Sequence, residues 1–464
     1  MTGERVVVLD GTAAFNEEHA RVVATLHEII RGTGGTVQTF VLRDERIAQC
    51  IGCFGCWLET PGLCRSADRG QDVIAAMVHA DTVLLVTPVT FGGYSSTLKR
   101  LVDHWVQLAL PFFQNYKGEL HHPLRYGRFP RLVAVGVQPN PDEAEAELFR
   151  ALVARNALNF RPPSYAAEVV AGSETEDELR ARLAGALSRR DAVPSLTAIQ
   201  HLLPEPAAPP HADFPAGTRK ALVLVGSPKT KKPSTSGVLG RHLLARLEAR
   251  GWQGDVLTIT AAIRDQAWRE RMLDAVDAAD LLVLAFPLYI DALPTLLTRA
   301  LEAIVERRIG QGGPRPQRIA AVVNSGFPEA QHSLPALAIC ARFAAVARMT
   351  WVGGLAMGAG EALSSGVPLT DQAAGSRPPV GHVIAALDGA AAELAENRPL
   401  SPSTAALIAR VPMPILPFPV WRRFFAFMGG RHWRQEAATH GVRGADLLAR
   451  PFATGSPATA ASVR

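Results

Sequence analysis

Cysteine is scarce in this chain of 464 residues, which has only five, and four of them lie between residues 50 and 64. The chain also lacks any run of about 18 uncharged apolar residues, so no membrane-spanning helix is expected. Its first stretch, MTGERVVVLDG, offers only five apolar residues before Asp10, too few for a secretory signal. We therefore expect a cytoplasmic protein, in which clustered thiols bind metal more often than they form disulfides.

Excess charge is also low, at a formal net charge of +5, and it is concentrated near the C-terminus. From Arg410 onward the chain has eight arginines and two acidic residues, so the rest is close to neutral. This excludes the basic face that contacts phosphates in a nucleic-acid-binding protein. With 48% hydrophobic and 20% charged residues the chain can bury large cores, and its length suggests two or three domains.

Strand-like apolar runs alternate with helical patterns twice along the chain. In the first half we predict strands at 5–10, 36–42, 81–88, 131–137 and 165–171, and helices at 17–31, 94–107, 141–154 and 174–189. In the second half we predict strands at 219–228, 254–260, 279–287, 318–324 and 349–358, and helices at 235–250 and 378–396. Such alternation forms βαβ units, so each half predicts a parallel sheet with helices on both faces. The matching runs ADTVLLVTP and ADLLVLAFP indicate two copies of one five-stranded unit.

The predicted domains are residues 1–190 and 219–400, joined by a linker rich in proline and alanine at 191–218. A basic, proline-rich extension follows at 401–464, where four prolines between residues 412 and 419 prevent a continuous helix. Its piece from Val420 to Met428 could be a short amphipathic anchor on an anionic membrane. We favour the interpretation that the extension is an arm that packs on the second half or on a partner subunit.

The loop GSPKTKKPSTSG (226–237) lies between a predicted strand and a predicted helix. Backbone N–H groups at a helix N-terminus favour a phosphate. The loop adds hydroxyl and ammonium groups from Ser227, Lys229, Lys231, Lys232, Ser234, Thr235 and Ser236. It has neither the Walker ending G-K-[ST] nor the dinucleotide pattern G-x-G-x-x-G. We interpret it as a phosphate loop rather than a solvated turn. In its counterpart at 10–20, Glu17 and Glu18 compete with an anion for the helix N-terminus, so we expect a degenerate site there.

Taken together, these stretches resemble the flavodoxin-like fold, in particular the NADPH-dependent FMN reductase family and its iron–sulfur flavoprotein relatives. The second half carries the resemblance in GSPK…STSG, ADLLVLAFPLYIDALP and NSGFPEA, and the first half in CIGCFGCWLETPGLC and TPVTFGGYSSTLKRLVD. The resemblance implies an α/β fold of two tandem doubly wound domains, each with a five-stranded parallel sheet.

In that family, the loop after the first strand holds the FMN phosphate, and the loops after the third and fourth strands lie along the isoalloxazine ring. The contacts that the resemblance implies in the second half are Ser227, Lys229, Ser234, Thr235, Ser236, Pro287, Leu288, Tyr289, Asn324, Ser325 and Gly326. Because family members commonly pair two copies, we expect a pseudo-dimer within one chain, which could assemble further into a homo-oligomer. In it, Phe91, Gly92 and Gly93 of the first half would approach the ring or the nicotinamide. Thr90 stands where the family usually has an aromatic residue, which argues against a second flavin there.

Cys50, Cys53, Cys56 and Cys64 follow the spacing C-x2-C-x2-C-x7-C. This resembles the motif by which iron–sulfur flavoproteins hold a [4Fe–4S] cluster, and the short spacings suit such a cluster. A loop whose cysteines hold no metal is an equal alternative. Zinc is a weaker one, because its structural sites usually join two separate C-x2-C knuckles.

The implied function is an FMN-dependent NAD(P)H oxidoreductase that passes electrons to a small-molecule or protein acceptor. The resemblance assigns no catalytic acid or base. Two alternatives stay open: an electron carrier or redox sensor without NAD(P)H turnover, and a tandem in which neither half binds a flavin.

Lys99, Asp103, His121, His122 and Cys340 have simpler interpretations. We predict that Lys99 and Asp103 form a solvated pair on a helix. We place His121 and His122 in a surface loop, because no Cys or His at metal-ligand spacing surrounds them, and we expect Cys340 to be a buried helix residue.

Overall fold

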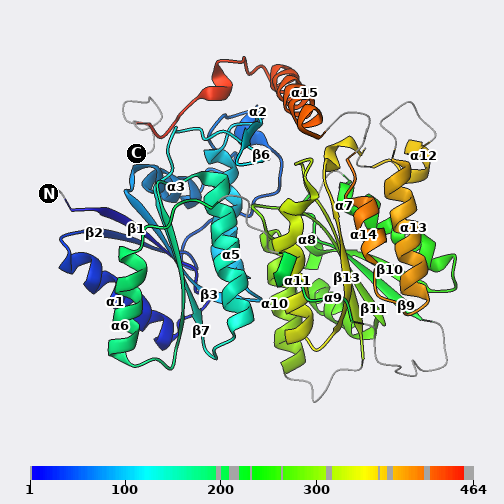
Figure 1. Cartoon of the computed structure of the whole chain (residues 1–464), viewed down its shortest axis with the longest axis horizontal. Helices are drawn as coiled ribbons and strands as arrows, with labels where there is room; N and C mark the ends of the chain where they lie inside the picture. Colours follow the sequence, from blue (N-terminus) through cyan, green and yellow to red (C-terminus); the bar gives the residue numbers. More distant parts are fainter. Residues whose placement is uncertain are drawn as a thin grey trace. The chain divides into compact units, whose positions relative to one another are not determined.

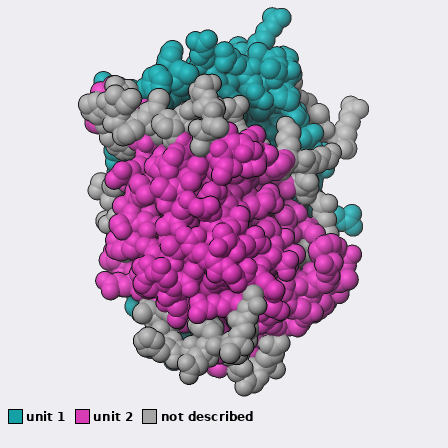
Figure 2. All heavy atoms as spheres, turned by 90° about the vertical axis from the view of Figure 1, so that its right-hand side faces the viewer, with its two compact units in different colours: residues 1–198, 422–464 teal, residues 199–421 magenta. Residues whose placement is uncertain are grey.

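The computed structural model describes residues 3–194, 200–207, 219–229, 233–262, 265–309, 316–363, 366–373, 380–411 and 418–453. Lys231, Lys232, parts of the expected linker and the prolines at 412, 414 and 417 lie outside the described residues. The chain divides into two compact units (Figure 2). Unit 1 comprises residues 1–198 and 422–464, and unit 2 comprises residues 199–421.

Unit 1 contains a parallel sheet in the order β2-β1-β3-β7-β8, with the short strand β4 antiparallel to the end of β3 (Figure 1). The strands are β1 (Arg5–Asp10), β2 (Thr36–Val41), β3 (Thr82–Thr90), β4 (Gly93–Tyr94), β7 (Arg131–Gln138) and β8 (Tyr165–Ala171). Helices α1 (Glu17–Gly32) and α6 (Glu176–Ser188) cover one face, and α5 (Glu143–Phe160) covers the other (Figure 1).

Unit 2 repeats this strand order as β10-β9-β11-β12-β13, with every pair parallel. The strands are β9 (Lys220–Val225), β10 (Gln253–Thr258), β11 (Leu281–Pro287), β12 (Arg318–Asn324) and β13 (Thr350–Met357). Helices α7 (Thr235–Glu248) and α13 (Gly381–Ala395) pack on one face. Helices α10 (Thr295–Ile309) and α11 (Leu334–Val346) lie on the other (Figure 1). The predicted tandem of doubly wound domains is therefore confirmed.

The remaining elements connect these layers or extend them. They are α2 (Gly55–Leu58), α3 (Arg69–His79), α4 (Ser96–Val102), η1 (Asp103–Leu108), β5 (Gln114–Tyr116), β6 (Glu119–His121), η2 (Gln200–Leu202), α8 (Ile259–Ala262), α9 (Gln266–Ala278), η3 (Ala330–Ser333), η4 (Gly360–Ala362), α12 (Leu369–Ala373), α14 (Pro402–Ile408), α15 (Phe418–Thr439) and η5 (Asp446–Leu448). The single helix predicted at 94–107 is instead α4 followed by the 3-10 helix η1, because β4 takes up the residues before Ser95.

Both central sheets are built from nearly continuous apolar runs, as expected for strands that are covered on both faces. In β3 and β11 every residue of the first six is buried. Because the five main strands of each sheet are parallel, their carboxyl ends meet along one edge, where open α/β sheets bind ligands. Among the described residues, no helix is long and apolar enough to cross a membrane.

The predicted C-terminal extension is divided between the two units. Helix α14 contributes Ile408 to the core of unit 2, as predicted, whereas the described part from Arg422 onward packs on unit 1, where the prediction is wrong. Trp433 of α15 meets Trp57 of the cysteine loop edge to face, with ring centroids 5.1 Å apart. Beyond the helix, the buried guanidinium of Arg125 donates hydrogen bonds to the carbonyl oxygens of Leu447 (2.9 Å) and Ala449 (2.8 Å). These contacts join segments more than 300 positions apart, which no local pattern in the sequence could indicate.

Candidate functional site

The loops predicted to bind the flavin gather at the carboxyl edge of the unit 2 sheet. They are tied to one another by main-chain hydrogen bonds: Gly226 N donates to Ala285 O (2.8 Å), and Leu288 N donates to Asn324 O (2.8 Å). The structure brings to this edge the residues Ser227, Lys229, Ser234, Thr235, Ser236, Pro287, Leu288, Tyr289, Asn324, Ser325 and Gly326. They follow β9, β11 and β12 or begin α7, as the βαβ pattern requires.

The N-terminus of α7 is organised as an anion site. Ser234 caps the helix, since its hydroxyl accepts a hydrogen bond from Gly237 N (3.1 Å) and its carbonyl accepts one from Val238 N (3.0 Å). The N–H groups of Thr235 and Ser236 lie in the first turn of α7, where no helical carbonyl oxygen one turn earlier can accept their hydrogen bonds. They therefore remain available to a ligand. Ser236 is 1% exposed, and its Oγ has no hydrogen-bond partner among the described residues. A buried hydroxyl of this kind needs a partner, which a bound phosphate oxygen would provide.

Asn324, at the end of β12, presents a second unpartnered polar atom. Its side chain is buried, and its Oδ1 has no hydrogen-bond partner among the described residues. Gly360, in the loop after β13, lies against it: a Cβ on Gly360 would approach Asn324 Nδ2 to 3.0 Å and Ser325 O to 3.1 Å. Gly360 N also donates to Ser325 O (2.7 Å). The loop after β13 thus reaches this sheet edge through Gly360.

A tight turn with unusual backbone angles follows β11. Tyr289 and Ala292 exchange main-chain hydrogen bonds of 3.0 and 3.1 Å around Ile290 (φ 47°) and Asp291 (φ 57°). A β-branched residue at positive φ is strained, and such strain often marks ligand-binding loops. Pro287, Leu288 and Tyr289 are half-buried beside this turn. Ile290 gives no turn signal in the sequence.

The corresponding segment of unit 1 is a β-hairpin that packs on its own unit. Phe91 (φ 55°) and Gly92 (φ 77°) form the turn, and Gly93 begins β4. A Cβ on Gly92 would come within 2.6 Å of Leu148 Cδ2 in α5. The hydroxyl of Tyr94 lies 2.8 Å from Asn156 Oδ1, also in α5. The residues predicted to approach the ring or the nicotinamide are therefore buried or tightly packed against α5.

The first turn of unit 1 contains a carboxylate at the position that corresponds to the loop between β9 and α7 of unit 2. Asp10, at the end of β1, accepts hydrogen bonds from Thr12 N (2.9 Å) and Thr12 Oγ1 (2.5 Å), and its Oδ1 lies 3.0 Å from His19 Nε2. Burial alone would raise the pKa of Asp10, but the hydrogen bonds from His19 and Thr12 outweigh burial and hold the pKa below its ordinary value. The buried negative charge disfavours a phosphate in this loop.

The four clustered cysteines lie on a segment with three left-handed residues, Gly52 (φ 62°), Phe54 (φ 55°) and Gly62 (φ 88°). Burial is the largest influence on Cys50 and Cys56: it raises the pKa of Cys50 well above the ordinary range and that of Cys56 to about 12. The charges of neighbouring cysteines add to both shifts, which indicates that the thiols lie near one another.

Cys64 differs from the other thiols of the loop because it interacts with His104. Burial would raise the pKa of Cys64, but its hydrogen bond with His104 and the charge of His104 outweigh burial and lower the pKa. The other hydrogen bond of His104 joins its Nε2 to Ala48 O (2.8 Å).

The donor set fits a metal cluster in kind, but its arrangement is not that of a formed metal site. Four thiols in one loop are the ligands that an iron–sulfur cluster requires. In the described part of the chain, however, no group of three or more His, Cys, Asp or Glu side chains is arranged to hold a metal ion.

Two predictions next to the cysteine loop are wrong. Lys99 and Asp103 are both almost fully buried, with Lys99 Nζ donating to Asp103 Oδ1, so the pair is not solvated. His121 is buried in β6 and not in a surface loop, with its Nδ1 lying 2.7 Å from Asn159 Oδ1. Both lie where tertiary packing, and not local polarity, decides exposure. Cys340 is buried in α11, as predicted.

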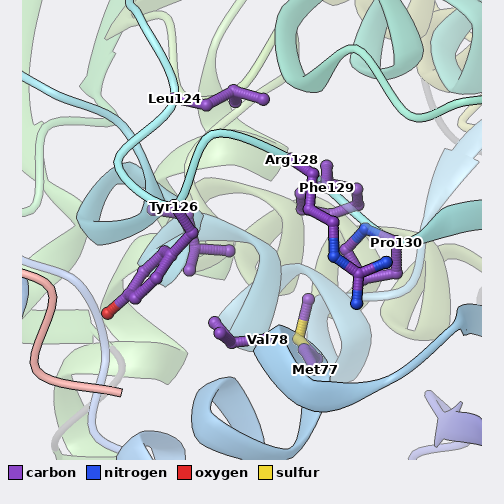
Figure 3. A pocket seen from close by; sticks show the side chains of 8 residues that line it. Met77, Val78, Leu124, Tyr126, Arg128, Phe129 and Pro130 are labelled. Atoms are coloured by element: carbon purple, nitrogen blue, oxygen red, sulfur yellow. The ribbon is translucent and has the colours of Figure 1, made fainter. Parts of the chain in front are cut away.

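A small apolar pocket lies in unit 1, away from all predicted site residues (Figure 3). It is lined by Met77, Val78, Leu108, Leu124, Tyr126, Arg128, Phe129 and Pro130. Its lining holds a single charged side chain, so it lacks the converging polar groups of a cofactor site.

Comparisons with known proteins find curated relatives named as iron–sulfur flavoproteins. One from Methanocaldococcus jannaschii is 38% identical over 108 residues, covering 23% of this chain and 55% of its own length. One from Methanosarcina thermophila is 23% identical over 104 residues, covering 22% of this chain and 53% of its own length. The chain thus spans about half the length of these relatives.

Similar solved structures include an NAD(P)H:quinone oxidoreductase from Methanothermobacter marburgensis. It is 13% identical, with a TM-score of 0.30, and the match covers 39% of this chain and 92% of that one. A second is an FMN-dependent NADH-azoreductase from Bacillus anthracis in complex with FMN. It is 12% identical, with a TM-score of 0.27, and the match covers 38% of this chain and all of that one. These scores are too low to support a functional argument.

Two family models match separate parts of the chain. Residues 5–169 match the model described as NADPH-dependent FMN reductase. Residues 219–338 match the model described as flavodoxin-like fold. The chain therefore joins a region that matches the NADPH-dependent FMN reductase family to a second region with the flavodoxin-like fold, as its motifs predicted.

Proposed function

We propose that the protein is an FMN-dependent NAD(P)H oxidoreductase whose flavin is held by unit 2. The observation that carries the proposal is a pair of buried polar atoms at one sheet edge that have no hydrogen-bond partner among the described residues, Ser236 Oγ at the start of α7 and Asn324 Oδ1 at the end of β12. The first would bind the phosphate, together with the amides of Thr235 and Ser236. The second would meet a polar group of the flavin ring. When bound, FMN accepts a hydride and passes electrons on; the protein binds and orients it.

The proposal assigns one flavin to each chain. In unit 1 the anion position is already filled by the ionised carboxylate of Asp10, which is hydrogen-bonded to Thr12 and lies against His19. In unit 2 the equivalent strand β9 ends in Gly226 and Ser227, and no acidic residue lies between Gly226 and Gly237. A phosphate would therefore meet like charge in unit 1 and helix amides in unit 2.

For the ring, we assign the half-buried Pro287, Leu288 and Tyr289 to one side and Ser325 and Gly326 to its polar edge. A Cβ on Gly326 would meet only Glu361 Oε1, at 3.9 Å, so this loop is open enough for a ligand to approach. Lys229, at the rim of the phosphate loop, would add positive charge toward the phosphate. The nicotinamide nucleotide would be the electron donor, and a small molecule or a protein the acceptor.

We further propose that Cys50, Cys53, Cys56 and Cys64 hold a [4Fe–4S] cluster. The curated relatives named as iron–sulfur flavoproteins and the four-thiol loop support this assignment. Thiolates are required as ligands, so loading would have to overcome the raised pKa values of Cys50 and Cys56. Iron and sulfide assays on anaerobically purified protein test it, with C56S as the variant. Absence of iron from the parent protein would favour the metal-free loop.

The flavin assignment is tested by titrating FMN into flavin-free protein and following the visible spectrum. We expect one FMN per chain, and a loss of affinity of about tenfold or more in S236A, because a hydrogen bond to a charged group is lost. T12A, at the equivalent loop of unit 1, is the matched control and should bind FMN like the parent. Two FMN per chain, or unchanged affinity in S236A, would contradict the assignment.

NADPH oxidation by the FMN-loaded protein separates the proposed enzyme from the alternatives. Turnover that falls in S236A supports the oxidoreductase. Bound FMN without turnover of NADH or NADPH would favour an electron carrier or a redox sensor. A protein that binds no FMN would be a tandem of flavodoxin-like units with another role.

A further inference from the structure

Helix α15 has two apolar sides, and among the described residues only one of them packs against the rest of the chain. Its inner side contributes the buried Trp433 and Ala437 to a cluster with Trp57 of the cysteine loop. Its outer side carries Phe424, Phe427 and Met428, which are 41%, 67% and 44% exposed. Phe427 and Met428 lie three and four positions after Phe424, so all three side chains lie on one side of the helix. Exposed, contiguous large apolar side chains mark a binding surface.

Positive charge lies along the same outer side. Arg423, Arg431 and Arg434 are exposed and follow the apolar stripe at helical spacing, and Glu436 is the only acidic residue of the helix. Arg434 lies over the ring of Phe112, with 4.8 Å between Cζ and the ring centroid, which holds its charge near the surface of the unit. The outer side thus combines aromatic and Met side chains with guanidinium groups.

We propose that this outer side of α15 binds the surface of an anionic phospholipid bilayer. A helix that lies in the membrane interface buries large apolar side chains between the headgroups and places arginines beside the lipid phosphates. Phe424, Phe427 and Met428 supply the first contact, and Arg423, Arg431 and Arg434 the second. The inner side of the helix meanwhile stays packed on unit 1 through Trp433.

The charges disfavour a second copy of the chain as the occupant of this surface. If two copies of α15 paired antiparallel about Phe427, Arg423 of each helix would face Arg431 of the other. Like charges so placed are destabilising. An anionic bilayer can instead pair lipid phosphates with all three exposed arginines at once. Its apolar interior also buries the Phe and Met side chains, which a polar polyanion such as a nucleic acid cannot do.

The test is sedimentation of the full chain with lipid vesicles. We expect retention on vesicles of phosphatidylcholine mixed with phosphatidylglycerol, little retention on phosphatidylcholine alone, and weaker binding as salt is added. Replacing two arginines in R431Q/R434Q should lower partitioning by about tenfold or more. The double variant F424S/F427S should lower it comparably.

Matched controls come from other exposed positions. I309S removes a side chain that is 82% exposed at the end of α10, and R250Q/R410Q removes two exposed arginines outside α15. Both should bind anionic vesicles like the parent. Equal retention on neutral vesicles, or no retention at all, would overturn the proposal. So would concentration-dependent dimerisation that F424S/F427S abolishes while vesicle binding is absent, since the surface would then join two copies.

Discussion

At the scale of single residues, unit 1 relies on charges buried within it. Lys99 and Asp103 lie one helical turn apart with less than 3% exposure each, and Asp103 also raises the pKa of the nearby Cys50 thiol. Desolvating two charges is unfavourable, and only their mutual contact and hydrogen bonds compensate for it. The pair therefore holds η1 in register with α4 beside the cysteine loop.

Replacing one member of this pair should destabilise the folded protein much more than replacing both. We expect K99M to lower the free energy of unfolding by about 3–5 kcal/mol, because it removes the buried ammonium group that neutralises the buried Asp103 carboxylate. The double variant K99M/D103L should lose less than K99M alone. Urea denaturation of the three proteins checks this, and equal loss in the single and double variants would contradict it.

Asp10 makes the stability of unit 1 depend on acid. Its pKa is held below the ordinary value of 3.8 in the folded protein, so folding favours the ionised form. The stabilisation is fully present above the unfolded pKa and is lost as the pH falls through the folded pKa. We expect D10N to be less stable than the parent at pH 7, and this difference to shrink below about pH 4. Thermal melting of both proteins across this range measures it; a constant difference would argue against the assignment.

At the scale of elements, the hairpin of β3 and β4 allows a backbone effect to be separated from a packing effect. Gly92 and Gly127 share the same φ of 77°, but a Cβ on Gly92 would clash with Leu148, whereas one on Gly127 would meet nothing within 4 Å. We expect G127A to cost about 1 kcal/mol through strain alone. G92A should cost about 2–4 kcal/mol, because overpacking is added. Chemical denaturation of the two variants compares them directly.

The arm that ends the described chain protects the cysteine loop. Trp433 packs against both Phe54 and Trp57, with ring centroids 5.1 Å apart in each case. We expect W433A to destabilise unit 1 by about 3–5 kcal/mol and to speed the reaction of Cys56 with a thiol reagent. W268A, which removes a partly exposed tryptophan from α9, should leave that rate unchanged. Equal labelling rates in W433A and the parent protein would show that the arm does not protect Cys56.

At the scale of the whole molecule, a ligand held by one unit should stabilise that unit selectively. We expect FMN to raise the melting temperature of the calorimetric transition of unit 2 and to leave that of unit 1 in place. At a hundredfold excess of FMN over its Kd the gain is about 2.7 kcal/mol. K99M identifies the unit 1 transition by lowering it. A shift of that transition by FMN would assign the flavin to unit 1.

The sheets could be predicted from the sequence because their signals are local. Runs such as VVVL at 6–9 and LLVLAF at 281–286 are strands whatever surrounds them, and their repetition revealed the two units. The position of the loop between β9 and α7 could be predicted for the same reason. The burial of Lys99 and the left-handed backbone of Ile290 could not be predicted from the sequence, because tertiary contacts impose both against local preference. The polar role of Asp10 was missed, since an aspartate at a strand end gives no signal of its partner His19.

The return of residues 422–453 to unit 1 has a consequence for synthesis. A ribosome makes the first sheet, then the whole of the second, and only afterwards the segment that covers Trp57 and satisfies Arg125. During translation the nascent cysteine loop is therefore bare while the later half is already able to fold. Any iron delivered to these thiols has its easiest access in that interval, before the last helix emerges and closes over them.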